Sequence, residues 1–268
     1  MSGSSRIETR FPRETGFLIL LTNDDGVNAP GLHALRQALA PLARLIIFAP
    51  DHNWSAAGHT KTMHKPLRVN RLQLQDGTEA YTTTGAPSDC VALALLGILP
   101  ERPDLVVSGI NQGPNLGHDV TYSGTIAGAM EAVISGLPAV ALSLDSYDSQ
   151  DFSLAAQFAA RIVGQVLQRG LPPGIFLNVN VPSPPPGSEV TKAIVTRLGR
   201  RVYRDVLVER QDPRGRPYYW IGGDLPGGHP DEGTDIWAMA NGYVSITPLH
   251  LDMTAHELLP ELQKWEIG

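Results

Sequence analysis

Two adjacent aspartates near the N-terminus, Asp24 and Asp25, are the residues whose type and spacing most directly suggest chemistry. They follow the aliphatic run 18–21 and precede a helical pattern that begins near Pro30 or Gly31, which places them in a turn between a buried strand and a helix. Neighbouring carboxylates repel each other, and a divalent cation relieves that repulsion. Such oxygen ligands suit magnesium, manganese or calcium. The alternative is that both aspartates form a turn and help to cap the helix.

A second candidate site follows another short apolar run, residues 104–107, where we expect a strand that ends at Ser108. The segment beyond it is rich in Gly and Asn and leads into Ser123, Gly124 and Thr125 at the start of a helix of small residues. Free backbone N–H groups at a helix N-terminus, together with two hydroxyls, form a cradle for phosphate. An ordinary helix cap at Ser123 is the alternative. The sequence contains none of the common nucleotide-binding, zinc-protease or serine-hydrolase motifs.

Both places fit an α/β protein with a mostly parallel sheet, because short apolar runs alternate with helical patterns along the chain. Parallel strands of this kind bind ligands beyond their carboxyl ends, where the acidic turn and the Gly-rich segment would meet. A hairpin with its turn at Asp76-Gly77 is expected to extend one edge of the sheet. The predicted strands are 18–21, 44–49, 67–74, 79–84, 104–107, 137–144, 175–181 and 243–247, and the predicted helices start near 30, 87, 123, 152 and 234.

The C-terminal part of the chain has a different character. Residues 192–208 are strand-like, and seven Arg between 197 and 216 make this region basic, which by itself would indicate nucleic-acid binding. Because the acidic segment 224–235 follows and can offset the charge, we prefer a β-hairpin arm that turns near 212–215 and docks on a partner subunit. An amphipathic helix over 256–265 is predicted to close the chain.

Composition excludes several classes of protein. The net charge of -6 gives no reason to expect nucleic acid as a partner, and no apolar run is long enough to cross a membrane. The polar segment 1–16 has no apolar core of a signal peptide and is read as a loose tail, ahead of a catalytic core over 17–190 and a C-terminal extension over 191–268. The only cysteine, Cys90, opens an apolar run and is read as a core residue. A cytoplasmic location is therefore expected.

Several motifs, occurring in the right order from about Phe17 to the C-terminus, resemble those of the SurE family, the stationary-phase survival proteins. They are Thr-Asn-Asp-Asp-Gly-Val from Thr22, Ala-Pro-Asp-His-Asn-Trp-Ser-Ala-Ala-Gly from Ala49, Ser-Gly-Ile-Asn-Gln-Gly-Pro-Asn-Leu-Gly from Ser108, Tyr-Ser-Gly-Thr from Tyr122 and Ser-Ile-Thr-Pro-Leu from Ser245. The resemblance implies a Rossmann-like core with helices on both faces of the sheet. It also implies a C-terminal arm exchanged between subunits, and a homodimer or homotetramer.

The same resemblance implies a divalent-metal-dependent phosphatase that hydrolyses nucleoside 5′-monophosphates, with 3′-monophosphates and short polyphosphate as further substrates. One Mg²⁺ or Mn²⁺ per subunit would be held by Asp24, Asp25, Ser55 and Asn111, which match the ligand positions of the family. Two carboxylates, a hydroxyl and an amide oxygen leave positions for water and a phosphate oxygen. We therefore expect Asp24 and Asp25 to be catalytic, and a metal-activated water to attack the phosphorus.

Phosphate oxygens would be stabilised by a set of amides and hydroxyls, as phosphoryl transfer requires. The residues expected to bind substrate are Asn28, Asn115, Ser123, Gly124 and Thr125. An aspartyl-phosphate intermediate is a weaker alternative, because phosphatases of that type carry Asp-x-Asp. A receiver-type signalling domain is excluded, because the strand 104–107 ends in Ser108-Gly109 and offers no phosphoacceptor. The rival function is a regulatory protein that binds metal and nucleotide without catalysis.

Other side chains near these motifs have open assignments. A general acid for the leaving group is sought among His52, His59 and His64, whose pKa range suits proton transfer near neutral pH. Trp54 is interpreted either as a stacking partner for a base or as a shield for its loop. Glu131, two turns into the helix that starts at Ser123, is expected to support the site or to face solvent.

Overall fold

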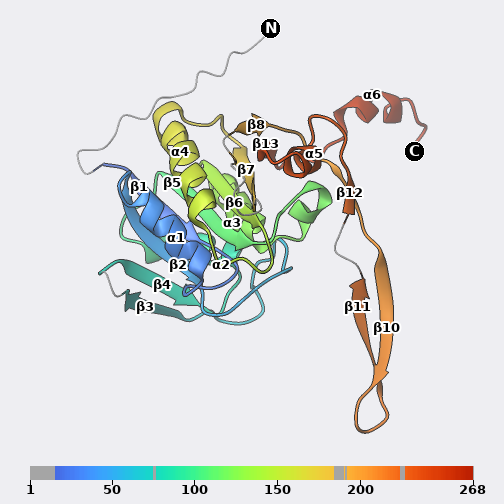
Figure 1. The fold of residues 1–268 in the computed structure, drawn as a ribbon, viewed down its shortest axis with the longest axis horizontal. Coiled ribbons are helices and arrows are strands. Elements are labelled where there is room, and N and C mark those ends of the chain that lie inside the picture. Colours follow the sequence, from blue (N-terminus) through green and yellow to red (C-terminus); the bar gives the residue numbers. More distant parts are fainter. Residues whose placement is uncertain (1–15, 75–76, 184–189, 191, 224–226, 268) are drawn as a thin grey trace.

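A computed structural model describes residues 16–74, 77–183, 190, 192–223 and 227–267 of the chain. The tail predicted for residues 1–16 and the hairpin turn predicted at Asp76-Gly77 fall largely outside this part. Within the described residues, the fold is an α/β sandwich whose central element is a nine-stranded sheet (Figure 1). The expected fold class, a mostly parallel sheet with helices on both faces, is therefore confirmed.

The strands of this sheet lie in the order β3-β4-β2-β1-β5-β6-β7-β13-β8. Strands β1, β2, β4, β5, β6 and β7 are mutually parallel, whereas β3 and β13 run antiparallel to β4 and β7. The bounds are β1 Leu18–Thr22, β2 Arg44–Pro50, β3 Val69–Gln73, β4 Glu79–Thr83, β5 Leu105–Gln112, β6 Ala139–Asp145, β7 Ile175–Pro182, β8 Ala193–Val195 and β13 Val244–His250.

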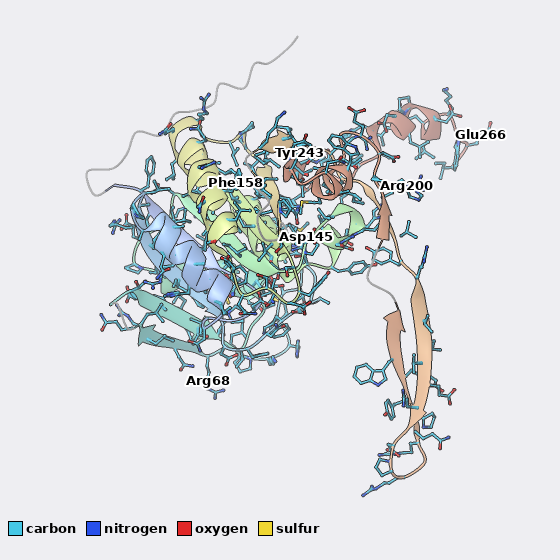
Figure 2. The ribbon with its side chains drawn as sticks, in the orientation of Figure 1. Arg68, Asp145, Phe158, Arg200, Tyr243 and Glu266 are labelled. Atoms are coloured by element: carbon cyan, nitrogen blue, oxygen red, sulfur yellow. The ribbon has the colours of Figure 1, made fainter. Side chains whose placement is uncertain are left out.

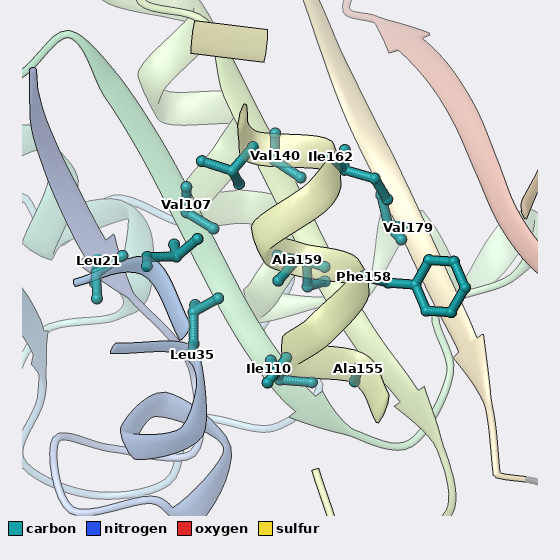
Figure 3. Packing of buried hydrophobic residues seen from close by; sticks show 14 of the residues in the cluster. Leu21, Leu35, Val107, Ile110, Val140, Ala155, Phe158, Ala159, Ile162 and Val179 are labelled. Atoms are coloured by element: carbon teal, nitrogen blue, oxygen red, sulfur yellow. The ribbon is translucent and has the colours of Figure 1, made fainter. Parts of the chain in front are cut away.

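Four helices cover the two faces of the sheet. α1 (Pro30–Leu39) and α4 (Ser153–Arg169) pack on one face, and α2 (Pro87–Leu93) and α3 (Gly124–Ile134) pack on the other. Figure 3 shows α4 lying along the sheet, with Ile110 and Ala155 at one end of the contact and Val140 and Ile162 at the other. The central strands are buried on both faces, which explains their continuous aliphatic sequences.

The chain order reverses at the centre of the sheet. β1 is followed in space by β2 on one side, and the later strands β5, β6 and β7 extend from its other side. In open α/β sheets, this switch point opens a crevice beyond the carboxyl ends of the two central strands. The acidic turn after β1 and the Gly-rich segment at the end of β5 meet there.

Helix α1 approaches this centre very closely. A Cβ atom built on Gly31 would lie 2.0 Å from the carbonyl oxygen of Ile110, in β5. Only glycine fits such an approach, because any side chain would collide with backbone. Pro30 occupies the first turn of the helix, as its fixed φ favours, so the predicted start of the helix is confirmed.

The C-terminal segment 192–267 divides between the sheet and a projecting arm. β13 and β8 continue the main sheet, and α5 (Asp235–Ala240) packs against it. The arm consists of β10 (Asp205–Gln211) and β11 (Pro217–Gly223), which form a separate antiparallel ladder and extend away from the body in Figure 1. At its base, β9 (Arg200–Val202) pairs with β12 (Gly227–His229). The hairpin predicted near 212–215 is thus confirmed in position.

Two predicted elements differ from the structure. The strand expected at 104–107 continues to Gln112, because an irregularity between Ser108 and Asn111 lets pairing with β6 resume beyond the glycine. The helix expected over 256–265 is reduced to a 3₁₀ turn, His256–Leu258, and the short α6, Leu259–Leu262, with no buried residue. The segment is not packed on the described part of the chain, and a helix of this length is not stable alone.

None of the helices in the described residues is long and apolar enough to cross a membrane.

Candidate active site

The turn after β1 is closed by the side chain of Asn23. Its Nδ2 donates to the carbonyl oxygen of Gly26 (2.9 Å) and its Oδ1 accepts from the Gly26 amide (3.2 Å). Gly26 has a φ of +102°, which favours glycine. The next amide, of Val27, donates to the Pro50 carbonyl at the end of β2 (2.9 Å). The two aspartates between Asn23 and Gly26 are therefore held in a fixed turn, as the sequence predicted for these four residues.

Asp24 lies beneath the first turn of α3. Its side chain is 3% exposed, and the Thr125 hydroxyl donates to its Oδ1. A Cβ atom on Gly124 would lie 2.7 Å from the Asp24 Cβ and 2.9 Å from its Oδ2, so glycine is required for this approach. Burial raises the pKa of Asp24 to about 6, and the neighbouring Asp25 adds to the rise while the Thr125 hydroxyl opposes it. A buried carboxylate of this kind gains from a nearby cation.

Asp25 is less deeply buried and has different partners. Its Oδ1 accepts from Nδ2 of Asn53 (3.2 Å), and burial raises its pKa while the backbone N–H of Gln112 opposes the rise. Asn53 belongs to the loop after β2 and Gln112 to the end of β5. The two carboxylates therefore connect the loops that follow three neighbouring strands, as expected at a switch point.

Ser55 is brought to the acidic turn by backbone contacts. The amide of Trp54 donates to the carbonyl oxygen of Asp24 (2.7 Å), and the amide of Ser55 donates to Oδ1 of Asn53 (2.7 Å). Asn53 thus holds both Asp25 and Ser55, a role that was not predicted from the sequence. An Asx turn two residues before a predicted ligand would have been the signal.

The loop that carries Ser55 is fastened to the helices by two buried carboxylates. Glu131, in α3, accepts from Lys61 Nζ (2.9 Å) and pairs with His59 Nε2 (3.1 Å), and these contacts lower the pKa of Glu131. Asp89, in α2, accepts from the amide (2.8 Å) and the hydroxyl (2.7 Å) of Thr62. Glu131 thus supports the loop, which was one of the two interpretations of this residue.

Asn111 lies on β5 itself, two residues before a tight turn. Its Nδ2 donates to the carbonyl oxygen of Gly113 (2.7 Å), which fixes the amide group. The Nδ2 is thereby used within the protein, and the Oδ1 atom is the one with the chemistry of a cation ligand. Asn111 comes to this position because β5 continues past the glycine at 109.

Asn115 is buried in a polar network beside β6 and β7. Its amide donates to Asn180 Oδ1 (2.7 Å), and its Nδ2 donates to the Ser143 hydroxyl (2.8 Å). Its carbonyl accepts from Asn178 (2.9 Å) and Asn180 (3.1 Å). These contacts hold the segment between β5 and α3, and binding of phosphate by Asn115 stays a prediction.

Two of the three predicted residues at the start of α3 make hydrogen bonds within the protein. Ser123 is the N-cap, and its hydroxyl oxygen accepts from the amide of Ile126 (3.1 Å). The Ser123 hydroxyl oxygen is used as an acceptor, so its proton can be donated to a ligand. The Thr125 hydroxyl, in contrast, donates to Asp24. The capping role of Ser123 is confirmed, and it is compatible with phosphate at the same helix end.

The remaining predicted residues lie around this centre. Asn28 is exposed in the turn before α1. The His52 ring pairs with Asp51 and lies 5.3 Å from the Trp54 ring, while His59 is engaged by Glu131. His64 is exposed. The structure therefore distinguishes the three histidines by their partners without assigning a general acid.

The donors collected at this centre fit a hard cation. Among the described residues, no group of three or more His, Cys, Asp or Glu side chains forms a metal cluster. The four predicted ligands Asp24, Asp25, Ser55 and Asn111 would supply two carboxylates and two neutral oxygens instead, a donor set suited to magnesium or manganese. The burial of Asp24 beside a second carboxylate is the structural observation that favours a cation here.

Comparison with known proteins gives a consistent result. The family model described as Survival protein SurE matches residues 19–205. A protein of Herpetosiphon aurantiacus named 5′-nucleotidase SurE is 57% identical over 240 residues, which cover 88% of this chain and 93% of that protein. A protein of Chloroflexus aggregans with the same name is 53% identical over 251 residues, covering 92% and 98%.

A solved structure is also similar. The crystal structure of a SurE protein from Aquifex aeolicus superposes with a TM-score of 0.77 at 42% identity, and the match covers 92% of this chain and 98% of that one. Family model, sequence relatives and fold thus agree over most of the chain, and we conclude that it belongs to the SurE family.

Proposed function

We propose that this chain is a 5′-nucleotidase that hydrolyses nucleoside 5′-monophosphates to nucleoside and inorganic phosphate, with a divalent cation as cofactor. The observation that carries the proposal is the position of Asp24 and Asp25 at the switch point of the sheet, with Asp24 against the N-terminus of α3. The names of the relatives, 5′-nucleotidase SurE, support the reaction class.

The cation, one Mg²⁺ or Mn²⁺ per subunit, would polarise the phosphoryl group and lower the pKa of water near it. Asp24, Asp25, Ser55 and Asn111 would hold it. Around them, Asn53 and Gln112 orient Asp25, and Thr125 orients Asp24. These contacts restrict the carboxylates before any substrate arrives, which is the preorganisation that charge stabilisation requires.

Substrate phosphate would lie at the N-terminus of α3. Backbone N–H groups around Gly124 and the hydroxyl proton of Ser123 are suited to its oxygens, while Asn28 and Asn115 remain candidate contacts. The helix dipole adds positive potential at this end. Because the Thr125 hydroxyl donates to Asp24, we propose that its main role is to orient that carboxylate and that its contact with phosphate is secondary.

We further propose that water attacks phosphorus directly. In that case the P–O bond to the nucleoside breaks, the new oxygen stays in phosphate, and no covalent enzyme intermediate forms. Hydrolysis of the native protein in ¹⁸O-water under single-turnover conditions tests this step. Label in the carboxyl group of Asp24 or Asp25 contradicts direct attack. Label in phosphate is expected on both routes, so a substrate with a chiral phosphorus is the second measurement: inversion of configuration supports direct attack, and retention supports the aspartyl-phosphate alternative.

The arm supports the proposal of a homodimer or homotetramer with exchanged hairpins. Figure 2 shows side chains along β10 and β11 projecting from the ladder with no other element beside them. Several of these are large and apolar, and they are exposed: Val206, Leu207, Tyr218, Tyr219, Trp220 and Ile221. An apolar surface of this kind is typical of an interface. We propose the C-terminal extension 191–268 as the unit that carries this contact.

The test is phosphate release from a panel of 5′- and 3′-nucleoside monophosphates and short polyphosphate, with Mn²⁺, Mg²⁺ or EDTA. Native protein is compared with Asp24→Asn, Asp25→Asn and the control Asp252→Asn, which changes an exposed aspartate in the C-terminal segment. Release that requires metal, is lost in the first two variants and persists in the control supports the proposal. No release from any substrate by folded, metal-supplied native protein would favour the regulatory nucleotide-binding function.

A further inference from the structure

Two exposed tyrosines, Tyr122 and Tyr147, flank the candidate active site. Their exposed fractions are 62% and 52%, which is high for large aromatic side chains. Both come from segments that also carry site residues, since Tyr122 directly precedes Ser123 and Tyr147 follows the end of β6, next to β5. Exposed aromatic rings at fixed positions provide flat surfaces for ligands.

Tyr147 is fixed against the backbone beside the candidate metal ligands. A Cβ atom on Gly113 would lie 2.6 Å from its Cε1, so the ring packs on glycine backbone. The carbonyl of the same glycine accepts from Asn111 (2.7 Å), and the side chain of Gln112 donates to the Tyr147 carbonyl (2.6 Å). Because Gln112 also directs its backbone N–H to Asp25, Tyr147 is linked to both candidate ligands through single residues.

Tyr122 is held in a comparable way by its backbone. Its amide donates to the carbonyl of Asp119 (3.0 Å), and its carbonyl accepts from the amide of Gly58 in the loop that carries Ser55 (2.8 Å). The next residue, Ser123, caps α3. The backbone of Tyr122 is therefore fixed directly before the cap of α3, and its side chain is exposed there.

A polar cluster lies behind these rings. Arg201 Nε donates to Asp119 Oδ2 (2.6 Å), and the hydroxyl of Tyr203 donates to Asp119 Oδ1 (2.6 Å). Burial raises the pKa of Tyr147, the carboxylates of Asp119 and Asp145 add to the rise, and Arg201 opposes it. Figure 2 locates Asp145 in the body of the molecule, at the end of β6.

Trp54, the other aromatic residue near the acidic turn, is less exposed for stacking on a base. Trp54 is only partly exposed, its ring lies 5.3 Å from that of His52, and its Nε1 is buried. It was one sequence-based candidate for stacking on a base. Comparison of the two sides favours the tyrosines, because their rings keep the larger exposed surfaces.

We propose that the nucleoside of the substrate binds on the exposed ring of Tyr147, with Tyr122 as a neighbouring aromatic contact, while its phosphate lies at the N-terminus of α3. The inference rests on the proposed function and assigns the base-binding part of the same site. A tyrosine ring accepts purines and pyrimidines alike, because every base has a π-face. The proposed site therefore distinguishes nucleotides from phosphate esters that lack a base.

Two measurements test this assignment. The first compares KM for AMP with KM for ribose 5-phosphate, which carries the same 5′-phosphate ester without a base. The second measures binding of adenosine by titration calorimetry, which requires no turnover. Both are applied to native protein, Tyr147→Ala, Tyr147→Trp and the control Trp265→Ala, which removes an exposed aromatic ring beyond α6.

For Tyr147→Ala we expect KM for AMP and Kd for adenosine to rise about tenfold, consistent with loss of one stacking contact. KM for ribose 5-phosphate should stay within about twofold. Tyr147→Trp keeps a π-surface and should retain both native values, as should the control. Equal effects on AMP and ribose 5-phosphate, or none on adenosine, overturn the assignment.

Failure of the two proposals can be separated. Native protein that releases no phosphate but binds adenosine, with binding weakened in Tyr147→Ala, refutes the nucleotidase and retains the nucleoside site. Native protein that hydrolyses AMP and ribose 5-phosphate with the same kcat/KM, and binds no adenosine, retains the phosphatase and refutes the nucleoside site. Native values in Tyr147→Trp support stacking on the ring, and values as weak as those of Tyr147→Ala contradict it.

Discussion

The sheet centre between β1 and β5 buries its key side chain and hydrogen-bonds it. The arm formed by β10 and β11 leaves its apolar side chains exposed. At the sheet centre, Asp24 is 3% exposed and its side chain is hydrogen-bonded within the chain. In the arm, the backbone ladder is complete, yet Leu207, Trp220 and Ile221 are 67%, 62% and 82% exposed. The side-chain contacts described at the candidate site thus come from one chain, whereas the two-stranded arm leaves its apolar side chains exposed, as is typical of an interface.

The largest effect expected from breaking the sheet centre is loss of activity in Asp24→Asn. Removing this charge should lower phosphate release on the order of 10³-fold, because the cation would lose a charged ligand and its alignment with the phosphate. The measurement is kcat/KM for the best nucleotide at saturating Mn²⁺. Retention of more than about a tenth of native activity would place the catalytic charge elsewhere.

The same substitution should stabilise the protein when metal is removed with EDTA. The pKa of Asp24 is raised in the fold from 3.8 to about 6, so ionisation opposes folding above pH 6, and at roughly 1.4 kcal/mol per pKa unit the gain is about 1 to 3 kcal/mol. The sign follows because the folded state binds the proton more tightly than the unfolded state. The gain should therefore be full at pH 8 and shrink as the pH falls through 6. Urea unfolding of both proteins checks this, and an unchanged difference at pH 5 contradicts it.

Packing at the sheet centre is tested by Gly31→Ala. The added methyl would lie 2.0 Å from the Ile110 carbonyl oxygen, so α1 must move away from β5, at a cost of about 2 to 4 kcal/mol in the free energy of unfolding. The control is Gly164→Ala in α4, where nothing lies within 4 Å of the added Cβ. There the change should stabilise the helix by about 0.5 to 1 kcal/mol. Similar effects of the two substitutions would show that close packing at Gly31 is unimportant.

The arm is tested by the double variant Trp220→Ser with Ile221→Ser. If these side chains are buried on another subunit, their loss should weaken subunit association by about 2 kcal/mol or more, a factor of at least about 30 in Kd. Analytical ultracentrifugation over a range of concentrations measures the change. The melting temperature of the double variant as a monomer should stay close to that of the native protein, because the substituted side chains do not pack on the body of their own chain. A native protein that is monomeric at all concentrations contradicts the role of the arm in assembly.

The smallest effect is expected for Glu131→Gln, which tests how the loop that carries Ser55 is held. Glu131→Gln removes the charge that holds His59 and Lys61, and we expect a loss of about 1 to 2 kcal/mol at neutral pH. The pKa of Glu131 is lowered in the fold from 4.5, so this stabilisation is present above about pH 4.5 and is lost as the pH falls through the lowered pKa. Unfolding at pH 7 and pH 4 measures the difference. The activity of this variant should also need more metal, because the loop with Ser55 is less firmly held.

The elements around the site were largely predictable because they depend on neighbours in the sequence. Continuous aliphatic residues specify the buried strand before Asp24, and Pro30 marks the start of α1. A cap at Ser123, which was the alternative to a phosphate cradle, is likewise a local feature of the sequence. The end of β5 was not predictable, because pairing of Asn111 with Ser143 in β6 resumes only after an irregularity. The last helix was predicted too long, and the part of it that forms buries none of its residues against the described part of the chain.

The sequence by itself determined the alternation of strands and helices, the acidic turn and the family, because these follow from local patterns and ordered motifs. Only the tertiary structure decided which side chains complete the site. Asn53 reaches Asp25 across 28 residues, Thr125 reaches Asp24 across 101, and Lys61 reaches Glu131 across 70. Such pairs arise from strand order and helix packing, and no local preference encodes them. The exposure of Tyr147 and of the arm also depends on which surfaces the folded chain leaves uncovered.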